Sequence, residues 1–259
     1  MKSSLLQSLT QDPDERITLA RVLDCADAAA SRAAVTHTAF LTPHERALAG
    51  QIAPGALFFG GYPSAERTVA VFLPDWADTD TLAAYADLAV IRAVRRDRED
   101  SAPTHRDYLG ALLGLGIRRD MVGDLLVRPD GCDILAAASI APFLRDNLTS
   151  AGRFPLDVTL VELCELIIPE QAFRELRDTV ASMRLDGIVA AAFSLSRGKA
   201  ADAVAAGKVF LNGVPCEKAD REVAAGDSIS LRGNGKCVLD SVGGVSRKGR
   251  ICIVLKRYL

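Results

Sequence analysis

The segment SLSRGKAADAVAAGKVFLNGV, residues 194–214, places a helix signal directly before a hairpin signal. Ser196 can cap an alanine-rich helix that ends at Gly207, because serine accepts a bond from a free N–H and glycine tolerates the left-handed conformation that ends helices. The strand that follows ends in Asn212-Gly213, a pair that tight hairpin turns favour. The segment therefore predicts a compact unit in which a helix leads into a tight β-turn.

The start of this helix is basic. Arg197 and Lys199 lie in its first turn, where unpaired N–H groups and the positive end of the helix dipole already favour an anion. Phosphate is the natural ligand for such a place. Lys208, Lys218 and Arg232 are expected to extend the positive surface.

Charge is divided unequally along the chain. From Arg184 onward there are 13 Lys and Arg residues against seven Asp and Glu, a net charge of +6. The preceding part has 18 basic and 26 acidic residues, a net charge of −8. A basic module joined to an acidic body indicates a polyanion partner at one end.

Length and composition fit a soluble protein of two or three domains. The N-terminus lacks the apolar core and cleavage site of a signal peptide, and no run of about 18 apolar residues occurs, so we expect a cytoplasmic protein without membrane contact. The six cysteines and three histidines are scattered. We therefore expect buried free thiols and neither a metal nor a cofactor.

The upstream part begins with helices and continues as a mixed pattern. DPDE (12–15) and TPHE (42–45) each supply a cap, a proline at the first helical position and a glutamate that can bond back to the cap. Further on, the pattern predicts strands at 67–74, 88–96 and 156–163, helices at 104–116 and 140–148, and a hairpin at 123–137. This order suggests an α+β sandwich with one open sheet face.

At the C-terminal end, RLDGIVAAAF (184–193), the Ser-Arg-x-x-Ala helix start and G-K-V-x-x-N-G together resemble the S4 RNA-binding domain over 184–232. The segments 58–67, 104–127 and 230–255 extend the likeness to the YlmH family of bacterial S4 proteins. That resemblance implies association with the large ribosomal subunit, through rRNA or tRNA, and a role in translation quality control or ribosome rescue. One departure is Asn234 and Lys236, where the family usually places an aromatic residue in RGxGR.

The resulting prediction is an α+β chain in four parts: a mainly helical N-terminal region (1–67), an RRM-like sandwich expected to bind RNA (68–165), a linker (166–183) and a C-terminal S4 domain (184–259). It is expected to bind structured RNA, not DNA, and to perform no catalysis. The candidate RNA-binding residues are Arg184, Ser194, Ser196, Arg197, Lys199, Lys208, Asn212, Lys218 and Arg232. Candidates for a secondary RNA contact are His105, Arg106, Arg118 and Arg119.

Two other classes of function stay open. RLDG at 184–187 is similar to the RLD of pseudouridine synthases, which also carry S4 domains, so an RNA-modifying enzyme with its site in 68–165 is one alternative. No separate GRLD segment lies upstream to supply a catalytic aspartate. A protein–protein adaptor that uses the open sheet face is the other. HRD at 105–107 lacks the companion motifs of a kinase, and Tyr62 and Arg67 have no assigned role.

Overall fold

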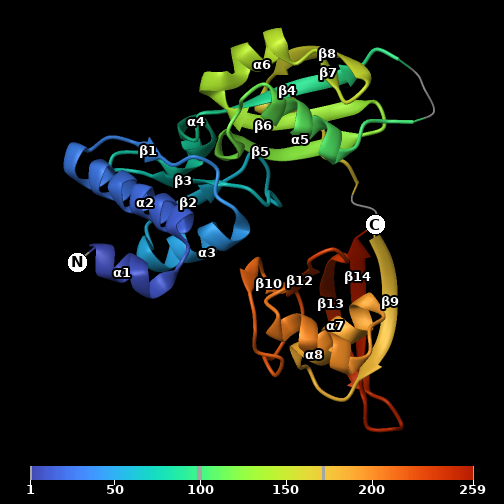
Figure 1. Ribbon diagram of the computed structural model, residues 1–259. Coiled ribbons are helices and arrows are strands. Elements are labelled where there is room, and N and C mark those ends of the chain that lie inside the picture. The colour runs from blue at the N-terminus through green and yellow to red at the C-terminus, as the bar shows by residue number, and fades with distance from the viewer. Residues whose placement is uncertain (1, 98–100, 171–172, 259) are drawn as a thin grey trace. The chain divides into compact units, whose positions relative to one another are not determined.

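The computed structural model describes residues 2–97, 101–170 and 173–258. The chain forms two compact units, Met1–Pro169 and Glu170–Leu259. Their described residues build three antiparallel sheets flanked by helices (Figure 1). Within the same ranges, every helix is too short or too polar to span a bilayer.

The first part of the N-terminal unit packs helices against a small sheet. Its elements are α1 (Lys2–Leu9), α2 (Pro13–Arg32), β1 (Thr36–His37), α3 (Pro43–Ile52), β2 (Leu57–Phe59) and β3 (Val69–Phe72). The strand order is β1-β3-β2. Leu19 and Val22 of α2, Leu48 of α3 and Phe72 of β3 belong to one buried cluster, so the apolar faces of both helices are covered by the sheet.

Proline and a capping side chain begin two of these helices, as the sequence predicts. At α3, Thr42 accepts from the Glu45 N–H while the Glu45 carboxylate accepts from the Thr42 N–H, which completes a capping box. At α2, the Asp12 carboxylate accepts from an N–H of the first turn. Glu15 accepts from the Thr10 hydroxyl instead of the Asp12 backbone, so the return bond expected there has a different donor.

The strand predicted at 67–74 joins the first sheet and not the central one. β3 pairs antiparallel with β1, where Phe72 lies opposite Thr36, and with β2, where Val69 lies opposite Phe59. All four residues of β3 are buried. A strand covered on both faces carries no alternation that would reveal its partner. The N-terminal sheet thus continues past the boundary expected at residue 67.

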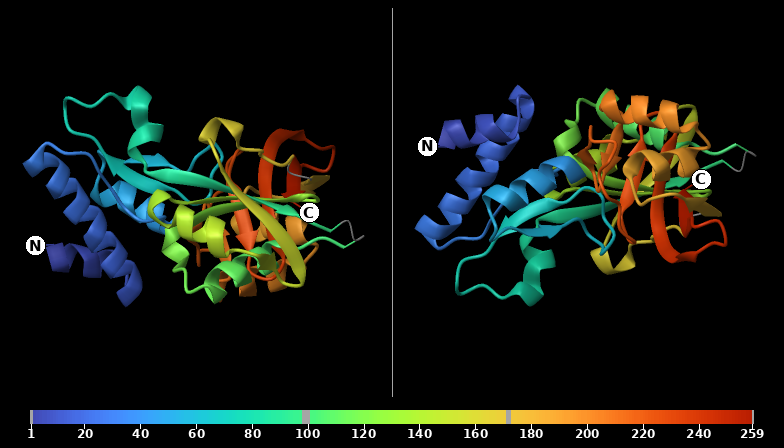
Figure 2. Two further views of the ribbon diagram at one scale, coloured as in Figure 1. Left: turned by 90° about the horizontal axis from the view of Figure 1, so that it is seen from above. Right: turned by 90° about the horizontal axis from the view of Figure 1, so that it is seen from below.

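The central part has the predicted strand-helix-strand-strand-helix-strand order, with one short additional strand. Its strands and helices are α4 (Leu82–Tyr85), β4 (Leu88–Arg95), α5 (His105–Gly114), β5 (Val122–Arg128), β6 (Gly131–Ala137), α6 (Ala141–Asn147), β7 (Ser150–Ala151) and β8 (Phe154–Val161). Four 3-10 turns complete it: η1 (Thr79–Thr81), η2 (Arg119–Met121), η3 (Ala138–Ile140) and η4 (Leu163–Glu165). The strand order is β5-β6-β4-β8-β7, and α5 and α6 cover one face (Figure 1, Figure 2).

The opposite face of this sheet is not open at its centre, which corrects the expectation from sequence. Leu135 alternates with Ile134, which packs beneath the helices, and is itself completely buried. A Cβ at Gly61 would lie 2.5 Å from the Leu135 side chain, and one at Gly123 would lie 2.6 Å from the Phe40 ring. The segments around Gly61 and Phe40 therefore cover this face, because the two glycines allow close approach.

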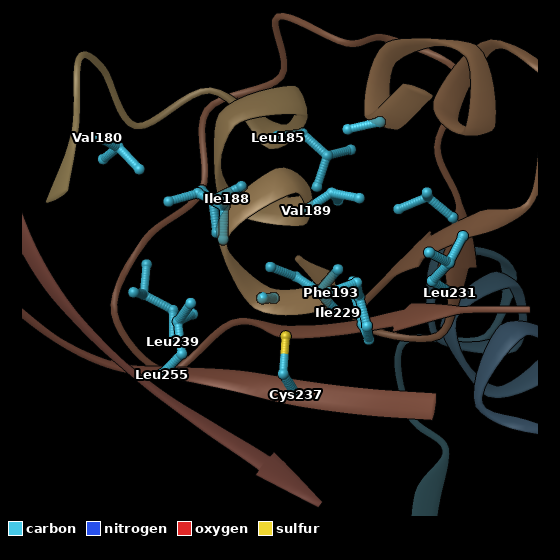
Figure 3. Close-up of a cluster of buried hydrophobic side chains, with 14 of the residues drawn as sticks. Val180, Leu185, Ile188, Val189, Phe193, Ile229, Leu231, Cys237, Leu239 and Leu255 are labelled. Carbon is cyan, nitrogen blue, oxygen red and sulfur yellow. The ribbon is translucent and has the colours of Figure 1, made fainter. Parts of the chain in front are cut away.

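The C-terminal unit places two helices against a six-stranded sheet. Its elements are β9 (Phe173–Val180), α7 (Leu185–Phe193), α8 (Arg197–Ala205), β10 (Val209–Leu211), β11 (Val214–Pro215), β12 (Ser228–Leu231), β13 (Gly235–Val245) and β14 (Ile251–Tyr258). The strand order is β11-β10-β12-β13-β14-β9. Leu185, Ile188 and Phe193 of α7 share a buried cluster with Ile229 and Leu239 of the sheet (Figure 3).

The stretch 166–183, expected to be a linker, contains β9. This strand pairs with β14 along its whole length, from Phe173 opposite Tyr258 to Val180 opposite Ile251. Four of its eight residues are charged, a composition typical of an edge strand that resists further pairing. The strand could not be predicted from the local sequence, since its partner β14 lies more than 70 residues further along the chain.

Candidate nucleic-acid interface

The turn between α7 and α8 sets the direction of the basic helix start. Ser194 ends α7 in the left-handed conformation, with φ of 54°. The Ser196 hydroxyl then accepts from the Lys199 N–H at 3.3 Å, which confirms Ser196 as the N-cap of α8. Ser194, Ser196, Arg197 and Lys199 are all exposed. The backbone thus presents the first turn of α8, with its two basic side chains, to solvent.

Asp186 holds two of the predicted RNA-binding arginines. Its carboxylate accepts from Arg184 Nε at 3.2 Å and from Arg197 Nε at 3.2 Å, while its own side chain is only 6% exposed. Burial raises the pKa of Asp186, but the hydrogen bonds from Arg184 and Arg197 outweigh it and leave the pKa below its usual value. The buried carboxylate therefore stays charged and fixes two guanidinium groups at the surface.

Asp186 positions Arg184 and Arg197, a role different from the one that its sequence motif suggested. Its place in RLDG suggested a likeness to pseudouridine synthases, but the carboxylate is occupied by Arg184, Arg197 and the Gly187 N–H. The sequence did contain a hint of this role, because Asp186 lies two residues after Arg184 and eleven before Arg197 in the most basic part of the chain. The pairing itself depends on how α7 and α8 pack and is invisible in sequence.

The remaining basic candidates are Lys208, Lys218 and Arg232, and a described contact joins two of them. Lys208 and Arg232 are adjacent, since the Arg232 N–H donates to the Lys208 carbonyl at 3.0 Å. The Arg232 guanidinium stands 5.6 Å from the centre of the Phe210 ring, a cation–π contact that orients it. Lys218 is exposed, but no described contact brings it to this group.

Asn212 acts inside the unit. With φ of 52° at Asn212 and 81° at Gly213, the pair forms the predicted two-residue turn between β10 and β11. The Asn212 side chain donates to Asp227 at 2.8 Å and accepts from the Ser228 N–H at 2.8 Å. Both polar ends of the amide bind the turn to the start of β12. These bonds account for an asparagine at this position without any contact to RNA.

The four secondary candidates differ in exposure and in the partners that they already have. Arg119 donates to the carbonyls of Val122 and Gly123, and burial together with Arg67 lowers its pKa to about 10. Burial, with Arg119 nearby, also lowers the pKa of His105. Arg118 pairs with Asp120 at 2.5 Å. Arg106 and Arg118 are the exposed cations of this set, whereas Arg119 serves the local backbone.

The GGYPSAER segment has a structural task centred on Asp124 of β5. The Asp124 carboxylate accepts from the Tyr62 hydroxyl at 2.9 Å, the Glu66 N–H at 2.7 Å and the Arg67 N–H at 3.1 Å. Arg67 also donates to the Val122 carbonyl at 3.0 Å. These bonds fasten the segment to the edge strand of the central sheet. Tyr62 and Arg67 had no role predictable from sequence because Asp124 lies 57 residues or more away.

Comparisons with known proteins agree with this arrangement. Three family descriptions match in order: "YlmH, N-terminal" over residues 14–73, "Putative RNA-binding domain in YlmH" over 98–165 and "S4 domain" over 183–229. A relative from Bacillus subtilis (strain 168), named "Ribosome-associated protein quality control protein P2", is 32% identical over 224 residues, which cover 85% of this chain and 86% of the relative. The chain belongs to the YlmH family.

The YlmH resemblance predicted from sequence is thereby confirmed, including its N-terminal, RNA-binding and S4 domains. A solved structure, "Cell division protein ylmH from Streptococcus pneumoniae", is also similar, with 19% identity and a TM-score of 0.49 over 61% of this chain and 97% of that one. In this YlmH chain the S4 match ends at residue 229. It therefore leaves out β9, β13 and β14, which build half of the C-terminal sheet.

Proposed function

We propose that this chain binds structured RNA, rRNA or tRNA, on the large ribosomal subunit and acts in translation quality control or ribosome rescue in the cytoplasm. The observation that carries the proposal is the buried Asp186 carboxylate, which holds Arg184 and Arg197 beside the exposed start of α8. The arrangement suits A-form RNA, whose phosphates and shape are the features that proteins read in double-stranded regions.

The printed name of the Bacillus subtilis relative supports the biological setting, since that protein is described as ribosome-associated and as a quality control protein. The same name supports a binding role without covalent chemistry for this chain. The engagement of Asp186 with two arginines is further support, because the residue that suggested a modifying enzyme has a structural explanation.

For the central part we propose an RRM-like sandwich that contributes recognition without base stacking on its sheet. The strand order β5-β6-β4-β8-β7 supports the RRM-like assignment. Because segments around Phe40 and Gly61 cover the centre of the free sheet face, RNA would contact exposed residues such as Arg106 and Arg118 instead. Weak contacts of this kind add selectivity once the S4 domain is bound, through effective concentration.

The test is the double variant Arg197→Ala/Lys199→Ala. Neither side chain is buried, and Arg184 and the Gly187 N–H still bond to Asp186, so the fold should persist, while affinity for a fluorescently labelled stem-loop RNA should fall by about tenfold or more. For each phosphate that the variant no longer neutralises, the slope of log affinity against log salt should also become shallower by about 0.7–0.9. Fluorescence anisotropy across a salt series measures both quantities.

A charge-matched control is Arg174→Ala/Arg177→Ala, which removes two exposed arginines from β9 of the same unit. Its affinity should stay within about threefold of the parent protein, since charges outside the contact surface act only through the screened overall field. Equal affinities of a folded Arg197→Ala/Lys199→Ala variant and the parent would remove the helix start from the RNA-binding surface.

A further inference from the structure

We propose that the RNA-binding surface of the C-terminal unit extends beyond the S4 match, through a phosphate-binding hollow between Arg197 and Arg250, to the tip of the β13–β14 hairpin. The proposal rests on the proposed function and deepens it. The hollow joins a residue inside the matched range 183–229 to one outside it.

The hollow has a volume of about 320 Å³ and lies where β9 ends beside α7. Water occupies about 30 Å³ per molecule in the liquid, so the space accommodates a hydrated phosphate group. Helix α7 contributes only small residues, Gly187, Ala190 and Ala191, to the described lining. Arg197 and Arg250 both line the same space.

Arg250 is held in place without a carboxylate. Its Nε donates to the Thr179 hydroxyl at 2.9 Å and its Nη2 donates to the Thr179 carbonyl. Among the described residues no acidic side chain forms an ion pair with it. The guanidinium therefore has no paired carboxylate beside it while its direction is set by β9, and fixed arginines of this kind suit phosphate oxygens.

Arg197 is the second cation of the lining. Its hydrogen bond to Asp186 uses Nε, which leaves the terminal nitrogens available for a ligand. Asp178 is the acidic residue in the lining, and its carboxylate accepts from the Thr179 N–H at 2.7 Å. With Asp186 counted, Arg184, Arg197 and Arg250 stand against Asp178 and Asp186, three guanidinium groups to two carboxylates, and the balance favours an anion.

The hairpin tip continues the positive surface. The Gly249 N–H donates to the Ser246 carbonyl at 2.9 Å, and the Arg250 N–H donates to the Ser246 hydroxyl at 3.1 Å, so the tip is a formed turn. Arg247 and Lys248 occupy its two central positions and are exposed. In Figure 1 the tip lies at the same end of the unit as the loop that follows β9.

The ligand that fits this arrangement is a run of the RNA backbone. One phosphate would occupy the hollow and neighbouring phosphates would face Arg247 and Lys248, because an RNA strand repeats its charge at regular intervals and a free phosphate does not. A free phosphate ion has the same chemistry in the hollow alone, so the experiment must separate the two sources.

The experiment compares Arg250→Gln and Arg247→Ala/Lys248→Ala with Arg177→Ala in the full chain. Arg177 is an exposed arginine of β9 that pairs with Glu175 and does not line the hollow. Affinity for the labelled stem-loop RNA should fall about threefold to tenfold for each charge removed at the hollow or tip, with a salt slope shallower by about 0.7–0.9 for each phosphate no longer neutralised. Arg177→Ala should keep the RNA affinity within about twofold of the parent and leave the salt slope unchanged.

Because Arg250 also bonds to β9, thermal unfolding of Arg250→Gln is measured alongside. Arg247→Ala/Lys248→Ala removes side chains with no described bond, so it keeps the test decisive if Arg250→Gln is unstable.

Tip and hollow variants that bind RNA like Arg177→Ala, while Arg197→Ala/Lys199→Ala binds it weakly, would overturn the extension and leave the proposed function intact. Thermal stabilisation by inorganic phosphate that depends on Arg250, with unchanged RNA affinity of both variants, would assign the hollow to free phosphate and also overturn it. A parent protein that binds no RNA would instead remove the proposed function.

Discussion

Replacing Asp133 by alanine is expected to lower the free energy of unfolding of the N-terminal unit by about 3–5 kcal/mol. Asp133 is completely buried in β6. Its carboxylate accepts two bonds from Arg92, at 2.9 and 2.7 Å, forms an ion pair with Arg128 at 3.0 Å, and accepts from the Ile167 N–H at 2.9 Å. Removing it takes from the largely buried Arg92 guanidinium its paired carboxylate and leaves Arg128 with only the exposed Asp130, which is more costly than the absence of the bonds alone.

Chemical denaturation of the full chain measures this effect, and Asp157→Ala is the matched control. Asp157 lies on β8 of the same sheet and pairs with Arg96, but both side chains are more than half exposed. Its removal should change stability by no more than about 1 kcal/mol. If the two aspartate variants unfold at the same denaturant concentration, the buried network does not stabilise the unit.

The Asp133 carboxylate also makes the free energy of unfolding depend on pH. Burial raises the pKa of Asp133, but hydrogen bonds from Arg92, the Ile167 N–H and Arg128 outweigh it and hold the pKa below its usual value. Since the folded pKa is depressed, its stabilising contribution is present above the unfolded value of about 3.9 and is lost as the pH falls through the folded value. The stability difference between parent and Asp133→Ala should therefore shrink below about pH 4.

The second large effect is expected at Asp124. Asp124→Ala removes the acceptor for the Tyr62 hydroxyl and for the N–H groups of Glu66 and Arg67 and should cost about 2–4 kcal/mol. Tyr62→Phe removes one of these bonds and should cost about 1 kcal/mol. Hydrogen exchange should show faster opening of 60–67 in Asp124→Ala, while affinity for stem-loop RNA stays unchanged. Weakened RNA binding in a folded Asp124→Ala variant would show that the segment serves recognition and not only attachment.

Local signals predicted much of this fold. The caps at Thr42 and Ser196, the turn at Asn212-Gly213 and the hairpin around Pro129-Asp130 each depend on a few neighbouring residues, and each forms where the sequence predicts it. Long-range pairing was not predictable in the same way. β9 is a strand only because β14 pairs with it, and the free face of the central sheet is covered only because Gly61 and Gly123 admit neighbouring segments.

In the candidate site too, local features were predictable and long-range contacts were not. That Arg184 and Arg197 are basic and near a helix start follows from sequence, but their shared attachment to Asp186 depends on the packing of α7 against α8. Arg250 was not predicted as a site residue because its partner Thr179 lies 71 residues earlier and is brought to it only by the pairing of β14 with β9. Asn212 was predicted from its motif position, and the structure shows both ends of its amide bonded within the unit.

The most direct test of the central claim is sedimentation of a cell lysate through a sucrose gradient, followed by detection of this protein and of its Arg197→Ala/Lys199→Ala variant. The parent protein should travel with the large ribosomal subunit, and the variant should shift toward the top of the gradient, because we propose that the S4 surface supplies most of the RNA affinity. A parent protein found only at the top, at low salt and with intact subunits in the same gradient, would contradict the account.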